Sequence, residues 1–69
     1  MMKIEYDKEV DAAYIYIKYP IKEGEAVNNV KLKDNIIVDF DKDGKLLGVE
    51  VLDASKFLSR SVLEESQVN

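Results

Sequence analysis

The chain has 69 residues, a formal net charge of -4, and neither cysteine nor histidine. A chain this short forms one domain with a modest core, which usually gains stability from a disulfide, a metal or association with another chain. The missing residue types exclude disulfides, thiol nucleophiles and the commonest general base and zinc ligand, which leaves association. The acidic balance argues against direct nucleic-acid binding. No apolar run reaches the roughly 18 residues of a membrane span, so we expect no membrane partner and a cytoplasmic protein.

Two strands are predicted in the first part of the chain. Residues 2–6 alternate apolar and charged side chains, which is the pattern of a strand with one buried face. Residues 12–18 are rich in β-branched and aromatic residues and form the second strand. Its outer face carries Tyr14 and Tyr16. A proline and a glycine then indicate a loop over residues 19–24, because proline cannot donate to a sheet ladder.

A weaker third strand is predicted over residues 25–32, and the acidic segment 39–50 follows after one further turn. This segment matches the calcium-loop pattern D-x-D-x-D-G-x5-E letter for letter. Its β-branched, alternating flanks instead favour two strands joined by a two-residue turn at Asp43-Gly44. That register predicts three apolar cross-strand pairs: Phe40 with Leu47, Val38 with Val49, and Ile36 with Val51. A hairpin separates Asp41 from Glu50 by roughly 13 Å, so we favour the hairpin and predict no metal site.

A helix is predicted at the C-terminal end, where Asp53 fits the N-cap position. Apolar residues follow at helical spacing, so this helix would cover the sheet and end near Leu63. We predict an α+β fold, a five-stranded antiparallel β-meander with one C-terminal helix packed on one face. Residues 1–63 form the single domain, and residues 64–69 form a flexible polar tail.

The sheet face opposite this helix is the predicted binding face. Its members combine aromatic, apolar and acidic side chains: Tyr14, Tyr16, Ile37, Asp39, Leu46, Glu50 and Leu52. Monomeric proteins seldom leave such a surface in contact with water, so we expect a homodimer that packs sheet against sheet. The expected function is therefore that of a non-catalytic binding or assembly module, with a small protein as a further partner.

An alternative from another class is a small-ligand binder or an enzyme that uses Asp39, Glu50 and Tyr16. Paired carboxylates act as acid and base when their environments separate their pKa values, and a diagonal cross-strand contact of roughly 7 to 8 Å permits such a pair. Calcium binding over Asp39–Glu50 is a third hypothesis. Without a pocket in view, the preferred prediction contains no catalytic residue, no metal and no cofactor.

Four segments resemble a known family: Met2–Asp7, Asp11–Ile15, Ile37–Gly44 and Gly48–Ser55. They are similar to the domain-of-unknown-function family 2283, which contains small prokaryotic proteins, and the match extends from residue 2 to about residue 58. The resemblance implies a fold that agrees with the one predicted above and implies no established activity. It also suggests an antitoxin-like role beside a small protein partner.

Overall fold

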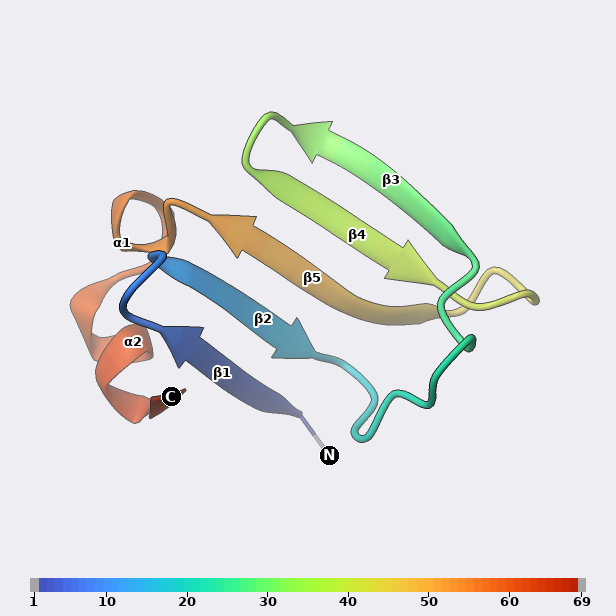
Figure 1. The fold of residues 1–69 in the computed structure, drawn as a ribbon, viewed down its shortest axis with the longest axis horizontal. Helices are drawn as coiled ribbons and strands as arrows, with labels where there is room; N and C mark the ends of the chain where they lie inside the picture. The colour runs from blue at the N-terminus through green and yellow to red at the C-terminus, as the bar shows by residue number, and fades with distance from the viewer. Residues whose placement is uncertain (1, 69) are drawn as a thin grey trace.

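Five antiparallel strands form one open sheet in this computed structural model, which describes residues 2–68 (Figure 1). In spatial order the strands are β3 (Asn28–Lys33), β4 (Ile36–Phe40), β5 (Leu46–Leu52), β2 (Ala12–Tyr16) and β1 (Lys3–Asp7). Two short helices follow β5, namely α1 (Ala54–Phe57) and α2 (Arg60–Glu65), and the two-residue strand β6 (Gln67–Val68) then pairs in parallel with β1. The predicted α+β class, with one antiparallel sheet and a helical C-terminal part, is confirmed.

The strand order differs from that of an uninterrupted meander, because β2 pairs with β5 and not with β3. The β1–β2 hairpin and the three strands β3, β4 and β5 are two units that join along β2 and β5. Residues 17–27 carry the chain around one end of the sheet to its far edge (Figure 1). Alanine, isoleucine and tyrosine suit β2 to the interior of the sheet, whereas β3 contains two asparagines and two lysines and is exposed along its whole length. Composition therefore explains which strand forms the edge.

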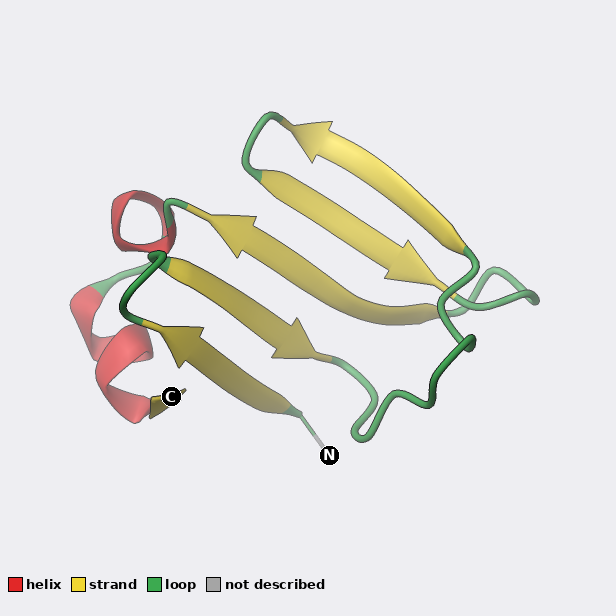
Figure 2. Cartoon of the chain, viewed as in Figure 1, coloured by secondary structure: helices red, strands yellow, loops and turns green. Residues whose placement is uncertain are grey.

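The helices cover only part of one sheet face. Ala54 at the start of α1 is fully buried against Ala13 and Val51, and Leu58 and Leu63 pack on the same cluster. Figure 2 shows both helices at one end of the sheet, beside β1, β2 and β5, with β3 and β4 lying away from them. The uncovered part of the sheet is therefore the β3–β4 side.

The predicted single helix is divided in two. Leu58 adopts an extended conformation, and Ser59 then begins α2 by accepting a hydrogen bond from the N–H of Val62. A serine at the N-cap satisfies one of the backbone donors that a new helix leaves free. Within the predicted tail at residues 64–69, α2 continues to Glu65 and β6 pairs with β1, while the flexibility of this segment stays a prediction.

The acidic segment 39–50 forms the β4–β5 hairpin, as the alternation of its flanks predicts. Its turn is one residue longer than predicted: Asp41 N–H donates to Lys45 O, Gly44 N–H donates to Asp41 O, and Gly44 adopts a φ of 78°. This is a three-residue hairpin loop with glycine in the left-handed region. The Asp41 carboxylate also accepts hydrogen bonds from the N–H groups of Asp43 and Lys45. These two bonds explain why an aspartate suits the first position of the turn.

The longer turn makes one predicted pair wrong, since Phe40 lies opposite Leu46 and not opposite Leu47. A β-bulge at Leu47 then restores the register, so the predicted pairs of Val38 with Val49 and of Ile36 with Val51 are correct. The carbonyl of Leu47 accepts hydrogen bonds from the N–H groups of Ile17 and Lys18, which directly follow β2. The Leu47 side chain is 1% exposed. The bulge therefore places one additional leucine in the core.

Candidate functional site

The sheet face opposite the helices carries most of the predicted binding residues. Tyr14 on β2 lies between its cross-strand partners Glu5 on β1 and Glu50 on β5, and Ile37 on β4 lies opposite Glu50. Because alternate residues of a strand share a face, Tyr16 and Asp39 belong to the same surface. We call the surface formed by Tyr14, Tyr16, Ile37, Asp39 and Glu50 the tyrosine face.

The two predicted leucines lie apart from this cluster. Leu52 shares the tyrosine face but lies at the end of β5, opposite Ala12, and is 36% exposed. Leu46 lies opposite Phe40, whose side chain alternates onto the helix side of the sheet with that of Val38. The structure therefore does not bring Leu46 to the tyrosine face, because the bulge at Leu47 reverses the alternation that the sequence suggests.

Tyr14 lies flat across β5. A side chain at Gly48 would meet the Tyr14 ring, since a Cβ built there falls 2.6 Å from two of the ring carbons. The Tyr14 hydroxyl reaches past Gly48 to donate a hydrogen bond of 2.7 Å to Asp39 on β4, and Asp39 also accepts one from the amide of Asn29. Gly48 therefore marks a point of close packing between β5 and Tyr14.

Tyr16 continues this line of contacts toward β1. Its hydroxyl donates to Glu5 at 2.8 Å, and its ring meets those of Tyr14 and Tyr19 edge-on, with centroid separations of 4.7 and 5.0 Å. The Lys3 ammonium lies 4.1 Å from the centre of the Tyr19 ring and donates to its hydroxyl at 3.0 Å. These contacts pair the hydroxyls of the three tyrosines with Asp39, Glu5 and Lys3.

The half-buried phenols of Tyr14 and Tyr16 are hydrogen-bond donors and not bases. Burial and the hydrogen bond to Asp39 raise the pKa of Tyr14 above its ordinary value, and the hydrogen bond to Glu5 does the same for the pKa of Tyr16. Both hydroxyls therefore stay protonated at neutral pH. Tyr16 bonds Glu5, and Tyr14 bonds Asp39, so the set of Asp39, Glu50 and Tyr16 proposed for catalysis is not joined by hydrogen bonds.

Asp11 joins the β1–β2 turn to the start of α1, a role that the sequence does not predict. It lies in the β1–β2 turn with a φ of 53°, and its main-chain oxygen accepts the N–H of Ala54 at 2.8 Å. Its carboxylate accepts bonds from the N–H and hydroxyl of Ser55 at 3.0 and 2.7 Å, and from the Tyr6 hydroxyl at 2.7 Å. The donors on Tyr6 and Ser55 lower the pKa of Asp11. A remote turn thus caps the first helix.

Asp53 occupies the predicted N-cap position of α1 but makes no capping bond with its side chain. Its φ of 52° turns the carboxylate away, and this group instead accepts a hydrogen bond of 2.8 Å from Asn35. The prediction that the Asp53 carboxylate caps the helix is therefore wrong. Asp11 and Asp53 both adopt the left-handed backbone conformation, which aspartate tolerates. The residue type was therefore the one feature of the sequence that could have indicated the turn conformation of Asp11.

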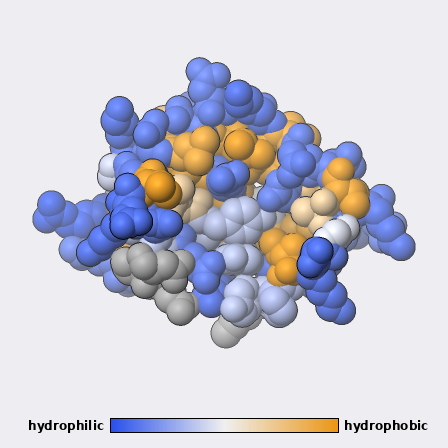
Figure 3. Space-filling view, in the orientation of Figure 1, coloured by the Kyte–Doolittle hydropathy of each residue, from blue (hydrophilic) through white to orange (hydrophobic). Residues whose placement is uncertain are grey.

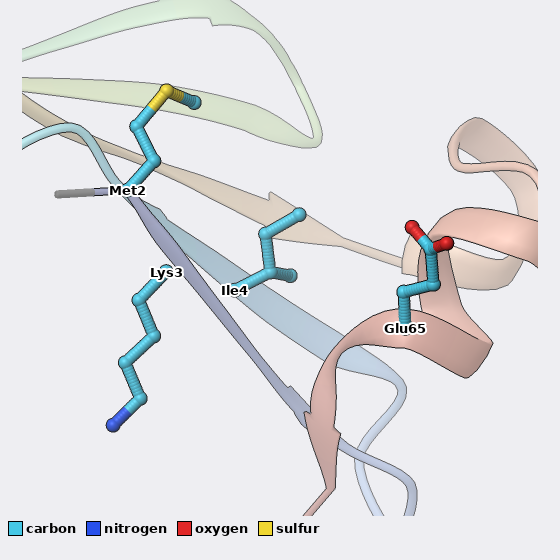
Figure 4. Close-up of a pocket in the computed structure, with 4 residues that line it drawn as sticks. All are labelled: Met2, Lys3, Ile4 and Glu65. Carbon is cyan, nitrogen blue, oxygen red and sulfur yellow. The ribbon is translucent and has the colours of Figure 1, made fainter.

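The surface hollows lie away from the tyrosine face. The hollow in Figure 4, of about 410 Å³, lies between the start of β1 and the end of α2 and is lined by Met2, Lys3, Ile4 and Glu65, with Lys3 extending away from Met2 and Ile4. Two others, of about 300 and 310 Å³, lie beside Arg60 and beside the β4–β5 turn. None of the three is lined by a residue of the tyrosine face.

Residues 2–68 contain no group of three or more acidic side chains arranged to hold a metal ion.

None of the helices among these residues has the length and apolar character needed to cross a bilayer. Figure 3 shows hydrophobic side chains in separate patches between hydrophilic ones on the side of the molecule that it displays.

Comparisons with known proteins agree with the resemblance found in the sequence. An uncharacterized protein of Methanocaldococcus jannaschii, MJ0789, is 38% identical over 58 residues, which cover 84% of this chain and 46% of that relative. The chain thus spans about half the length of this curated relative. No solved structure matches the chain. Residues 3–55 match the family described as protein of unknown function DUF2283, and the chain belongs to this family.

Proposed function

We propose that this protein is a homodimeric, non-catalytic assembly module. The observation that carries the proposal is the aliphatic surface around β3, where Val27, Val30 and Leu32 are 51%, 45% and 65% exposed. Side chains of this kind are stabilised by burial, by roughly 1.5–3 kcal/mol each for complete removal from water. A second copy of the chain would cover them.

The size of the exposed surface supports the same proposal. The chain exposes 4938 Å², compared with about 4,400 Å² expected for a monomeric protein of 7.9 kDa. The excess reflects the shape of the molecule, which measures 33 × 25 × 18 Å and leaves one side of its sheet uncovered beyond the helices. A small chain without disulfides gains stability when association buries such a surface.

The non-catalytic part of the proposal is supported by the tyrosine face. Its hydroxyl groups donate to Asp39 and Glu5, and none of the hollows described above opens onto it. Polar groups that are already paired within the chain are poorly placed to bind and transform a substrate. The net charge of -4 suits a small basic protein as the partner that the module recruits, in an antitoxin-like or related role.

Sedimentation equilibrium at micromolar concentration tests the proposal. We expect a mass of twice the 7.9 kDa of one chain, and we expect Val30→Asp to weaken association by at least tenfold. Val10→Asp is the matched control, because Val10 is 66% exposed and lies in the β1–β2 turn, far from β3 along the sheet. A monomeric mass at every concentration up to the millimolar range would overturn the proposal.

A further inference from the structure

The two edges of the sheet differ in how they are covered. On one side, the backbone of β1 pairs with β6 at Glu5 and Tyr6. On the other side, β3 is the last strand, and all six of its residues are exposed. An edge strand of this length presents a row of unpaired N–H and C=O groups that can pair with another chain.

The hydrogen bonds at the two ends of β4 define which of its backbone groups point toward β3. Leu52 N–H donates to Asn35 O, so in the antiparallel register of β4 and β5 the backbone groups of Asn35 and Ile37 point toward β5. The alternate residues then point toward β3, and Phe40 O does accept the N–H of Val27, just before β3. The orientation of β4 is therefore fixed at both of its ends.

The same alternation defines the free groups of β3. Val30 lies opposite Val38 and directs its backbone groups into the sheet. Its neighbours Asn29 and Lys31 consequently direct their N–H and C=O groups outward, to the side where the described residues supply no strand. These four groups are the hydrogen-bonding capacity of the free edge.

We propose that a second copy of the chain adds to this edge, antiparallel to β3, with Val30 opposite Val30 of the second copy. This inference rests on the proposed homodimer and names its interface. In this register Asn29 of each copy faces Lys31 of the other, and the two residues exchange both of their outward hydrogen bonds. The two sheets become one continuous sheet around a two-fold axis.

The register follows from the side chains that it brings together. The two Val30 side chains meet at the central, non-hydrogen-bonded pair, where side chains approach most closely, on the helix side of the sheet in the part that the helices leave uncovered. Pairing shifted by one residue, with Lys31 opposite Lys31, would place like charges directly opposite one another. Pairing with Asn29 opposite Asn29 would move each Val30 opposite Asn28.

Charge complementarity supports the same arrangement. Asn29 hydrogen-bonds Asp39 through its side-chain amide, so Lys31 of the second copy would enter the tyrosine face beside that carboxylate. Two such lysine–carboxylate contacts form by symmetry. Lysine on an edge strand otherwise serves to prevent strand pairing, and the experiment has to distinguish these two roles of Lys31.

Disulfide trapping tests the register, and the absence of cysteine from the chain makes any introduced cysteine unique. In Val30→Cys the two sulfur-bearing residues would lie about 4.5 Å apart between Cα atoms, within the disulfide range of about 4.4–6.8 Å. Val10→Cys is the control for random collision, since Val10 is at least as exposed. We expect Val30→Cys to form a covalent dimer at least tenfold faster under mild oxidation, with an unchanged circular dichroism spectrum.

The outcomes separate the interface from the proposed function. Equal rates for the two cysteine variants, in a chain that sediments as a dimer, would overturn edge pairing and leave the homodimer in place. A monomeric mass would overturn both. As a second test, we expect Lys31→Glu to weaken dimerisation at least tenfold and Lys42→Glu, the same charge change at the exposed β4–β5 turn, to have little effect. Equal effects of the two would contradict the role given to Lys31.

Discussion

At the scale of single residues, Gly48 is the one glycine of the three where an added Cβ would meet other atoms. It is buried under the ring of Tyr14, and the contact allows the Tyr14 hydroxyl to reach from β2 across β5 to Asp39 on β4. The sequence could indicate that Tyr14 and Asp39 share a face, because alternation determines faces. It could not indicate their hydrogen bond, since that bond depends on the pairing of β2 with β5, which connects distant parts of the chain.

We predict that Gly48→Ala lowers the free energy of unfolding by about 1–3 kcal/mol, because the new methyl group displaces the Tyr14 ring. Urea denaturation followed by circular dichroism measures this. In a Tyr14→Ala background the space is open, so the same change at Gly48 should be neutral or stabilising. An equal loss in both backgrounds would show that the ring contact is not the cause.

Asp11 gives a prediction about pH. Its pKa is lowered in the folded protein by the donors on Tyr6 and Ser55, so its stabilising effect is present above the unfolded value of about 3.8 and is lost as the pH falls through the folded value. We predict that Asp11→Asn, which keeps the left-handed backbone, lowers the urea midpoint at pH 7 and that the difference from the wild type shrinks below about pH 4.

The matched control for this prediction is Asp34→Asn, which makes the same charge change at an exposed turn position. A difference between Asp11→Asn and the wild type that stays constant from pH 7 to the acid limit would contradict the assignment. Asp11 would then act through its backbone conformation and not through its carboxylate.

At the scale of secondary-structure elements, local pairings were more predictable than distant ones. The β3–β4 and β4–β5 hairpins follow from alternating residues around turn-forming residues, and most of the β4–β5 register was predicted correctly. The additional turn residue shifts the pairing of β4 and β5 by one residue, and the bulge at Leu47 shifts it back. The alternation of apolar and polar residues beyond the bulge is therefore the same as for a two-residue turn, so the sequence contains no sign of either feature. The strand order was missed for a related reason: periodicity reports which face a residue occupies and not which strand lies beside it.

The β4–β5 turn depends on the left-handed conformation of Gly44, with a φ of 78° and no atoms near the position of a Cβ. We predict that Gly44→Ala destabilises the protein by about 1–2 kcal/mol, because an L-residue is strained in this region even where space is free. Gly44→Asn should cost less, since asparagine tolerates the same conformation. Thermal denaturation of the two variants decides this, and an alanine variant as stable as the wild type would contradict the hairpin geometry.

At the scale of the whole molecule, the sheet of this small acidic chain is covered by helices at one end and uncovered at β3. The helices bury the cluster of Ala13, Val51 and Ala54, and the Tyr14 and Tyr16 hydroxyls on the tyrosine face donate to carboxylates of the same chain. Among residues 2–68, the backbone edge of β3 has no neighbouring strand, and aliphatic side chains near it are exposed. A second copy added at that edge supplies partners for both.

Hydrogen exchange of the β3 backbone amides, measured by NMR, tests this claim most directly. In a dimer joined through β3, the outward amides of Asn29 and Lys31 should exchange slowly, and their protection should rise with protein concentration. The Val30 amide, which points toward β4, provides the internal reference and should be protected at all concentrations. Rapid exchange of Asn29 and Lys31 at a concentration where the protein sediments as a dimer would contradict the account.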